Sequence, residues 1–188
     1  MKEYSISVVI PVYNTPPSML EQCFNSVLQQ SISVKQMAVI DDGSTNQATK
    51  DCLSSYTTQH PDLFQVYYRE HSGIARTRNA GLEVVEGDYV CFLDSDDFWQ
   101  ENFLESLTSV VTSDIDIVFC GYQMVSFNGE RLGTQYPAEQ ILQDPLRFPY
   151  YTCGCGSRLY RMEHLRKYNC VFPIGCIMED EVFSNLSI

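Results

Sequence analysis

The chain has 188 residues, of which 44% are hydrophobic and 12% aromatic, and its formal net charge is −12. This length and composition suit a single domain with a sizeable core and exclude an intrinsically disordered chain. The negative charge argues against nucleic acid and against an anionic membrane surface as partners, because both are bound by clustered Lys and Arg side chains.

Strand and helix signals alternate through the first half of the chain. The β-branched run 6–12 predicts a strand that is covered on both faces, and the segment 16–18 marks the start of a helix with one apolar stripe. The alternation continues with expected strands at 37–40, 63–68 and 89–93 and expected helices at 48–56, 72–82 and 102–111. Ser72 is the expected N-cap of its helix. This order predicts a parallel sheet with right-handed crossovers.

A different pattern follows in the second half. We expect a strand at 115–120 and a hairpin formed by 122–127 and 131–136, because Asn128-Gly129 is a strong turn signal. A short strand at 158–160, a helix at 163–168 and a helix that begins near Glu179 complete the chain. The predicted fold class is α/β, with a mostly parallel central sheet flanked by helices and a smaller mixed or antiparallel part. Because no polar tail follows the last helix, we expect the sequence to be part of a longer chain.

The sequence shows no secretion signal and no apolar stretch of the roughly 18 residues that span a membrane. We therefore expect a cytoplasmic protein with reduced cysteines, and leave open a peripheral position at the inner face of the membrane for the full-length protein. Cys91 and Cys120 fall in predicted strands and are expected to be buried thiols. The cysteines at 153, 155, 170 and 176 could bind zinc, but their spacing lacks the paired Cys-x-x-Cys pattern and favours buried or loop thiols.

Acidic and polar residues follow three of the predicted strands. The run 94–97 (Asp-Ser-Asp-Asp) comes after the strand 89–93, the pair 41–42 (Asp-Asp) after the second strand, and the pair 13–14 (Tyr-Asn) after the first. The carboxyl ends of parallel strands meet at one edge of a sheet, where ligands bind in open α/β folds. Carboxylates as close as those in 94–97 repel one another unless a cation neutralises them. The pattern therefore predicts a divalent cation that holds an anionic substrate, most plausibly a diphosphate.

Other interpretations of these motifs are weaker. Read alone, Asp-Asp-Gly-Ser at 41–44 is typical of a simple turn. Asp94, Asp96 and Glu105 match three positions of an EF-hand loop, but Phe98 occupies a ligand position and Trp99 replaces the required glycine. The segment after the first strand lacks a glycine-rich dinucleotide fingerprint, and the chain has no P-loop lysine motif.

Four ordered segments together closely resemble family 2 glycosyltransferases of the GT-A fold. These segments are Ser7–Asn14 (SVVIPVYN), Ile40–Ser44 (IDDGS), Gly73–Gly81 (GIARTRNAG) and Gly87–Asp97 (GDYVCFLDSDD). The resemblance covers residues 5 to 112 and continues more weakly through 158–160 to Glu179-Asp180. It implies one GT-A domain over 1–188, with a nucleotide-sugar-binding half at 1–112 and an acceptor-side half at 113–188.

The resemblance also implies a nucleotide-sugar donor, usually a UDP-sugar, and a manganese or magnesium ion. Asp96 matches the metal-binding carboxylate, and Asp97 has no assigned role. The residues matched to the nucleotide-sugar are Pro11, Tyr13, Asn14, Asp41, Asp42, Arg78, Asp94 and Ser95. Among these, Pro11 and Tyr13 match positions beside the base and ribose, and Asp42 matches a carboxylate that contacts the base.

Two pairs of charged residues need separate treatment. Arg76 and Arg78 are two residues apart on a predicted helix, so they point to nearly opposite sides and only one is expected to face the donor. Arg78 lies in the Arg-Asn pair that the family shows and is the expected contact, with a surface ion pair as the alternative. Glu179-Asp180 resembles the catalytic Glu-Asp pair, in which the Asp is the general base. Acidic residues in a first helical turn also simply favour the helix dipole.

The implied activity is an inverting, metal-dependent transfer of a sugar to a hydroxyl group of a glycan or a lipid-linked saccharide, in polysaccharide or cell-surface glycan synthesis. Three alternatives remain at this stage. A non-catalytic binding module would need no general base, so the presence of Glu179-Asp180 counts against it. A sugar-nucleotide nucleotidyltransferase shares the fold class but should carry a glycine-rich loop with Arg and Lys after the first strand, which is missing. A domain that binds the donor without transferring the sugar stays open, because acceptor-site elements in this family often lie further along the chain.

Overall fold

The computed structural model describes residues 4–126, 129–135 and 154–187. Its main element is a six-stranded sheet with the order β3-β2-β1-β4-β8-β5. The strands of this sheet are β1 (Ile6–Val12), β2 (Gln36–Asp41), β3 (Phe64–Tyr68), β4 (Tyr89–Phe92), β5 (Ile117–Phe119) and β8 (Arg158–Arg161). The described helices are α1 (Pro17–Leu28), α2 (Gln47–Gln59), α3 (Ile74–Val84), α4 (Phe103–Thr108), α5 (Met162–Lys167) and α6 (Glu179–Leu186).

The sheet is parallel in its first half and mixed in its second. β1 lies between β2 and β4, and the strands β3, β2, β1 and β4 all run in the same direction. β8 then pairs antiparallel with both β4 and β5. The predicted α/β class with a mostly parallel sheet is confirmed, and the antiparallel part comes from β8, which inserts between two strands that precede it in the sequence.

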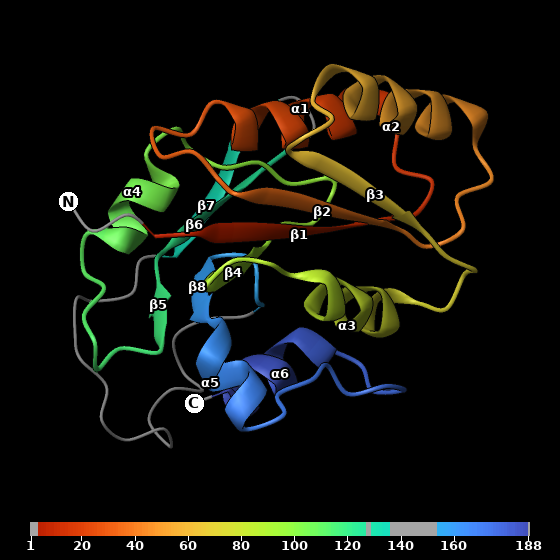
Figure 1. Ribbon diagram of the computed structural model, residues 1–188. Coiled ribbons are helices and arrows are strands. Elements are labelled where there is room, and N and C mark those ends of the chain that lie inside the picture. Colours follow the sequence, from red (N-terminus) through yellow and green to blue (C-terminus); the bar gives the residue numbers. More distant parts are fainter. Residues whose placement is uncertain (1–3, 127–128, 136–153, 188) are drawn as a thin grey trace.

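Helices cover both faces of the sheet (Figure 1). On one face α1 and α2 pack over a core that includes Val8 and Ile10 of β1, and on the other face α3, α5 and α6 pack around Val9. Every residue of β1 is buried, as the continuous β-branched run predicts for a strand covered on both faces. Gly81 lets α3 approach closely, because a Cβ atom there would lie 2.2 Å from Cγ1 of Val9.

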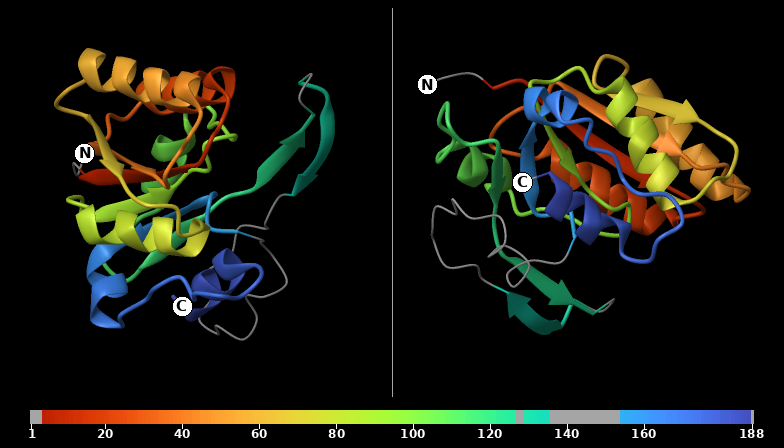
Figure 2. Two further views of the ribbon diagram at one scale, coloured as in Figure 1. Left: turned by 90° about the vertical axis from the view of Figure 1, so that its right-hand side faces the viewer. Right: turned by 90° about the horizontal axis from the view of Figure 1, so that it is seen from below.

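The predicted hairpin is present as a separate two-stranded sheet. β6 (Tyr122–Val125) pairs antiparallel with β7 (Arg131–Gln135), and Gly129 in the turn has φ +79°. Asn128 and Tyr136 lie outside the described residues. Figure 2 shows that this hairpin extends away from the main sheet. No described helix is long and apolar enough to cross a membrane.

The expected N-cap of α3 is wrong. Gly73 holds that position, with φ +90°, and the helix begins at Ile74. Ser72 lies one residue earlier, where its N–H and its hydroxyl both donate to Oδ1 of Asp42, at 2.8 and 3.1 Å. The serine therefore ties the start of α3 to the end of β2 and leaves the helix without a side-chain cap.

Candidate active site

The carboxyl ends of β1, β2 and β4 and the first turns of α3 surround a cleft of about 470 Å³. Pro11 to Pro16 form one wall, Asp42 and His71 a second, and the residues that follow β4 a third. The predicted site residues that line the cleft are Pro11, Tyr13, Asn14, Asp42, Arg78, Asp94, Ser95 and Asp96. Asp41 and Asp180 do not line it. The edge of the sheet at which the sequence places a ligand therefore carries a cleft built from the predicted motifs.

The adjacent carboxylates Asp41 and Asp42 have different surroundings. Asp41 is the last residue of β2, is 2% exposed, and accepts a hydrogen bond from the N–H of Ser44 at 3.2 Å, so it holds the turn. Asp42 lines the cleft, and its Oδ2 accepts from the N–H of Gly73 at 3.0 Å. Burial raises the pKa of Asp42, but hydrogen bonds from Ser72 and Gly73 outweigh it and lower the pKa below its ordinary value. Asp42 is therefore an anionic acceptor beside the cleft.

The ring of Tyr13 stacks on the imidazole of His71 at the mouth of the cleft. The ring centroids are 4.1 Å apart and the planes differ by 20°. His71 also brings Nδ1 to 2.8 Å from Oδ2 of Asp42. Tyr13 is 47% exposed and lies at the position where the sequence places a nucleotide base, with the His71 ring stacked on it. Sequence reasoning missed His71, because nothing in the local pattern joins it to Tyr13, 58 positions earlier.

Asn14 uses its side chain to shape the cleft wall. It has φ +53°, and its Oδ1 accepts hydrogen bonds from the N–H groups of Thr45 and Asn46 at 2.8 and 2.9 Å. Its own N–H donates to Oγ of Ser44 at 2.9 Å. These bonds join the loop after β1 to the loop after β2. The geometry assigns Asn14 a loop-holding role, and its predicted contact with a nucleotide-sugar stays a prediction.

Arg78 lies deep in the cleft and joins two acidic segments. Its Nη2 donates to Oδ1 of Asp94 at 2.6 Å and its Nη1 donates to Oε1 of Glu179 at 2.5 Å. Only 3% of the residue is exposed. Burial lowers the pKa of Arg78, but the carboxylate of Asp94, to which it donates, raises it above its ordinary value, so the guanidinium is charged. Arg78 therefore links the acidic run after β4 to the first turn of α6.

Asn79, which follows Arg78 in α3, fixes this helix to the segment that leads into α6. Asn79 donates from Nδ2 to the carbonyl of Phe172 at 2.9 Å and accepts from the N–H of Phe172 at 2.7 Å. The Phe172 ring stacks on Phe183 of α6, with centroids 3.9 Å apart, and lies 5.5 Å from the guanidinium carbon of Arg78. The pair Arg78-Asn79 thus holds α6 against the cleft from two sides.

The acidic run after β4 combines exposed carboxylates with a buried hydroxyl. The hydroxyl of Ser95 lies 2.7 Å from that of Thr15 and joins the loops after β4 and β1. Asp96 is exposed at the cleft. The pKa of Asp97 is raised to about 6 by partial burial and by the charges of Asp94 and Asp96. The negative charges of Asp94, Asp96 and Asp97 repel one another, and a bound cation would relieve this repulsion.

The donor set fits a hard divalent ion that takes part of its coordination from a substrate. Within the described residues no three His, Cys, Asp or Glu side chains are arranged to hold a metal ion. Mg²⁺ and similar ions are commonly held by one or two carboxylates together with phosphate oxygens and water. Asp96 at the cleft, with Asp94 beside it, supplies such a partial ligand set.

Glu179 and Asp180 open α6 directly after a residue with left-handed backbone. Met178, the N-cap, has φ +61°. The side chain of Glu179 turns toward Arg78 and is 13% exposed, whereas Asp180 accepts from the N–H of Glu181 at 3.0 Å. Asp180 lies close enough to Arg78 to influence its pKa. Arg78, which lines the cleft, therefore pairs with Glu179, whereas Asp180 forms no ion pair with a described arginine or lysine side chain, and the catalytic role of Asp180 stays a prediction.

The zinc alternative for the later cysteines is not tested, because Cys153 lies outside the described residues. Cys155 and Cys170 are buried and Cys176 is exposed. Burial raises the pKa of Cys155 to about 12, so this thiol beside Arg78 is neutral. The expected burial of Cys91 is confirmed, and Cys120 is half-buried.

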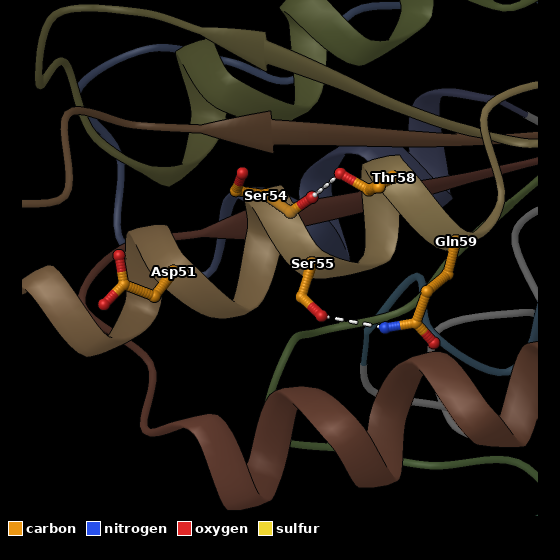
Figure 3. Close-up of a pocket in the computed structure, with 5 residues that line it drawn as sticks. All are labelled: Asp51, Ser54, Ser55, Thr58 and Gln59. Atoms are coloured by element: carbon orange, nitrogen blue, oxygen red, sulfur yellow. Dashed lines mark hydrogen bonds between the residues drawn. The ribbon is translucent and has the colours of Figure 1, made fainter.

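A second hollow, of about 450 Å³, lies along α2 (Figure 3). Its lining residues are Asp51, Ser54, Ser55, Thr58 and Gln59. Their polar groups bond within the helix: Nε2 of Gln59 donates to Oγ of Ser55 at 2.8 Å, and Oγ1 of Thr58 to the carbonyl of Ser54 at 2.9 Å. No charged groups converge there among these residues, so we place the candidate site in the cleft at the sheet edge.

The chain is similar to known glycosyltransferases in sequence and in fold. The family model described as Glycosyl transferase family 2 matches residues 7–169. TuaG of Bacillus subtilis, named as a teichuronic acid biosynthesis glycosyltransferase, is 38% identical over 128 residues, which are 68% of this chain and 50% of TuaG. EpsH of the same organism, named as a glycosyltransferase, is 28% identical over 98% of this chain and 56% of EpsH. The chain thus spans about half the length of these curated relatives.

Solved structures share the fold. Residues 1–349 of TarS from S. aureus, in complex with UDP-GlcNAc, superpose with a TM-score of 0.75 at 25% identity, over 97% of this chain and 53% of that chain. The mannosyltransferase PcManGT from Pyrobaculum calidifontis, in complex with GDP-Man and Mn²⁺, gives a TM-score of 0.69 at 17% identity. The match covers 97% of this chain and 51% of PcManGT. The second likeness, at this identity, concerns the fold alone.

Proposed function

The chain belongs to glycosyl transferase family 2, and on that premise we propose that it transfers a sugar from a nucleoside diphosphate donor to a hydroxyl acceptor. One observation carries the proposal. The cleft is lined by the aromatic ring of Tyr13 and the acceptor carboxylate of Asp42, and also by Asp94, Ser95 and Asp96 of the acidic run. A nucleotide base suits the first pair, and a diphosphate with its cation suits the second.

UDP is the proposed nucleotide. The TarS structures with UDP-GlcNAc and with UDP are more similar in sequence to this chain than is the enzyme that holds GDP-Man. Asp42 is anionic, so its carboxylate is a strong acceptor for a base N–H, and Tyr13 supplies an aromatic ring for stacking. Pro11 and Val12, which precede Tyr13 in the chain, line the same cleft.

The proposed metal is manganese or magnesium, held by Asp96 with Asp94 beside it. When bound, such an ion neutralises negative charge that develops on the leaving diphosphate. The chain itself contributes the rest of the site. Arg78 keeps Asp94 in place through the 2.6 Å hydrogen bond, and the Ser95–Thr15 contact fixes the loop that carries the carboxylates.

We propose a single displacement with inversion. The acceptor oxygen forms a bond to the anomeric carbon on the face opposite the diphosphate, while the bond from that carbon to the diphosphate oxygen breaks and its electron pair leaves with the nucleoside diphosphate. Asp180 takes the proton of the acceptor hydroxyl. A free Asp has a pKa of about 3.9 and is a weak base, but it suffices because the hydroxyl becomes acidic as its bond to the sugar forms.

The proposed acceptor is a glycan or a lipid-linked saccharide of a cell-surface polysaccharide. The name of TuaG, which matches 68% of this chain, supports this class. We propose a cytoplasmic site of action, with a peripheral position at the inner face of the membrane for the full-length protein. The seven cysteines of the described residues are all free, as a reducing compartment favours.

A panel of nucleotide-sugars screened by thermal shift tests this function. Ligands that bind only the native state raise its stability, by about 2.7 kcal/mol at 100 times Kd. We expect UDP-sugars with Mn²⁺ to raise the melting temperature most, and Tyr13→Ala to abolish most of the shift. A panel in which no nucleotide-sugar shifts the wild-type protein would contradict the proposal.

A further inference from the structure

His71 makes two contacts at the proposed base position. Its imidazole lies on the ring of Tyr13, with centroids 4.1 Å apart, and its Nδ1 is 2.8 Å from Oδ2 of Asp42. A planar nitrogen heterocycle that stacks on Tyr13 and donates an N–H to Asp42 is also the arrangement proposed above for the nucleotide base. In this structure a side chain of the protein itself therefore makes the contacts that a base would make.

The carboxylate of Asp42 is enclosed by groups of the protein itself. Oδ1 accepts from the N–H and the hydroxyl of Ser72, and Oδ2 accepts from the N–H of Gly73. The imidazole of His71 covers the remaining approach to Oδ2: its Nδ1 lies 2.8 Å from Oδ2 and 3.2 Å from the carbonyl oxygen of the same residue. A base N–H can reach Oδ2 only if one of these groups moves.

His71 is the group that can move away from Oδ2. The N–H groups of Ser72 and Gly73 are fixed at the start of α3, and the hydroxyl of Ser72 bonds Oδ1, not the Oδ2 that His71 covers. The side chain of His71 is 55% exposed, so it can rotate into solvent without opening the core. The same rotation uncovers the face of Tyr13.

We infer that His71 occupies the base subsite when no donor is bound, and that the nucleotide base must displace it from both Tyr13 and Asp42. This inference rests on the proposed function. His71 then acts as a specificity-determining residue: a base binds only if it can replace both the stacking contact and the hydrogen bond that the imidazole provides. The contacts of His71 with Tyr13 and Asp42 must be broken before any nucleotide base can bind. They therefore lower the affinity for every nucleotide by the free energy that breaking them costs.

Calorimetric titration with UDP in the presence of Mn²⁺ tests the inference on four proteins: wild type, His71→Ala, His71→Phe and His60→Ala. Alanine removes both contacts, so we expect UDP to bind about tenfold more tightly, the equivalent of one ordinary hydrogen bond. Phenylalanine keeps a ring for Tyr13 but no N–H, so it should bind UDP less tightly than the alanine variant. His60 caps the C-terminus of α2 and does not line the cleft, so His60→Ala should leave the affinity for UDP unchanged.

The outcomes separate the inference from the function on which it rests. If UDP binds the wild type and His71→Ala binds it equally or more weakly, His71 does not compete with the base and the inference fails alone. If UDP binds none of the four proteins, the proposed donor class fails and the inference fails with it.

Proton NMR of the histidine rings gives a second readout on the unmodified protein. The chain has three histidines, His60, His71 and His164. Saturating UDP should move the ring signals of His71 toward those of a free histidine, because the ring leaves the face of Tyr13, while those of His60 and His164 stay in place. A His71 signal that does not move at saturation would contradict the displacement.

Discussion

Asp180→Asn in the full-length protein is expected to lower the turnover of sugar transfer by about 10²–10⁴-fold, the usual contribution of a general base. Asparagine has nearly the same shape and can still accept the hydrogen bond that Asp180 takes from the N–H of Glu181. It cannot accept the proton of the acceptor hydroxyl. The affinity for UDP should stay unchanged, because Asp180 does not line the donor cleft.

Glu181→Gln is the matched control for this experiment. Glu181 is half-buried in the same first turn of α6 and loses one negative charge in the same way. Steady-state turnover and UDP affinity measured on both variants separate a lost base from a change in local charge. Near-normal turnover of Asp180→Asn, or an equal loss in Glu181→Gln, would remove Asp180 from the proposed mechanism.

Arg78→Ala is expected to cost about 3 kcal/mol of stability, the lower part of the range for removing one partner of a buried ion pair. The buried carboxylate of Glu179 would lose its partner, and Asp94 would lose the bond that orients it. Arg78→Lys keeps the charge, but a single ammonium cannot reproduce the two-armed contact of the guanidinium. We expect the lysine variant to be less destabilised and to transfer sugar poorly.

Arg76→Ala provides the control, because Arg76 is exposed and its guanidinium donates a 3.4 Å hydrogen bond to the carbonyl of Ser72. Denaturant unfolding of the three variants gives the stability differences, and transfer assays give the activity. If Arg78→Lys retains wild-type stability and transfer, the bridge between Asp94 and Glu179 does not hold the site together.

The sequence predicts the parts of the site that local pattern determines. Continuous β-branched residues identify β1, and polar residues directly after β1, β2 and β4 identify the sheet edge that carries the cleft. Helical spacing predicts that only one of Arg76 and Arg78 faces the cleft, and the resemblance to the family selects Arg78, which is the one that lines it. These signals need no knowledge of tertiary contacts.

Long-range contacts account for what the sequence does not predict. Arg78 reaches Glu179 across 101 positions, and Asn79 reaches Phe172 across 93. The left-handed conformations of Asn14 and Met178 depend on loops that only the folded sheet brings together. Asn14 consequently holds a neighbouring loop, and Ser72 bonds Asp42 instead of capping α3. No periodicity in the sequence encodes these pairings.

The central claim is that the cleft binds a nucleoside diphosphate together with a divalent metal through Asp96. Calorimetric titration of the chain with UDP, with and without Mn²⁺, tests it most directly when the wild type is compared with Asp96→Ala. We predict that Mn²⁺ tightens UDP binding to the wild type and that Asp96→Ala loses this gain while retaining weak, metal-independent binding through Tyr13 and Asp42. A wild-type protein that binds no UDP in the presence of Mn²⁺, or an Asp96→Ala variant with the full manganese-dependent gain, would contradict the claim.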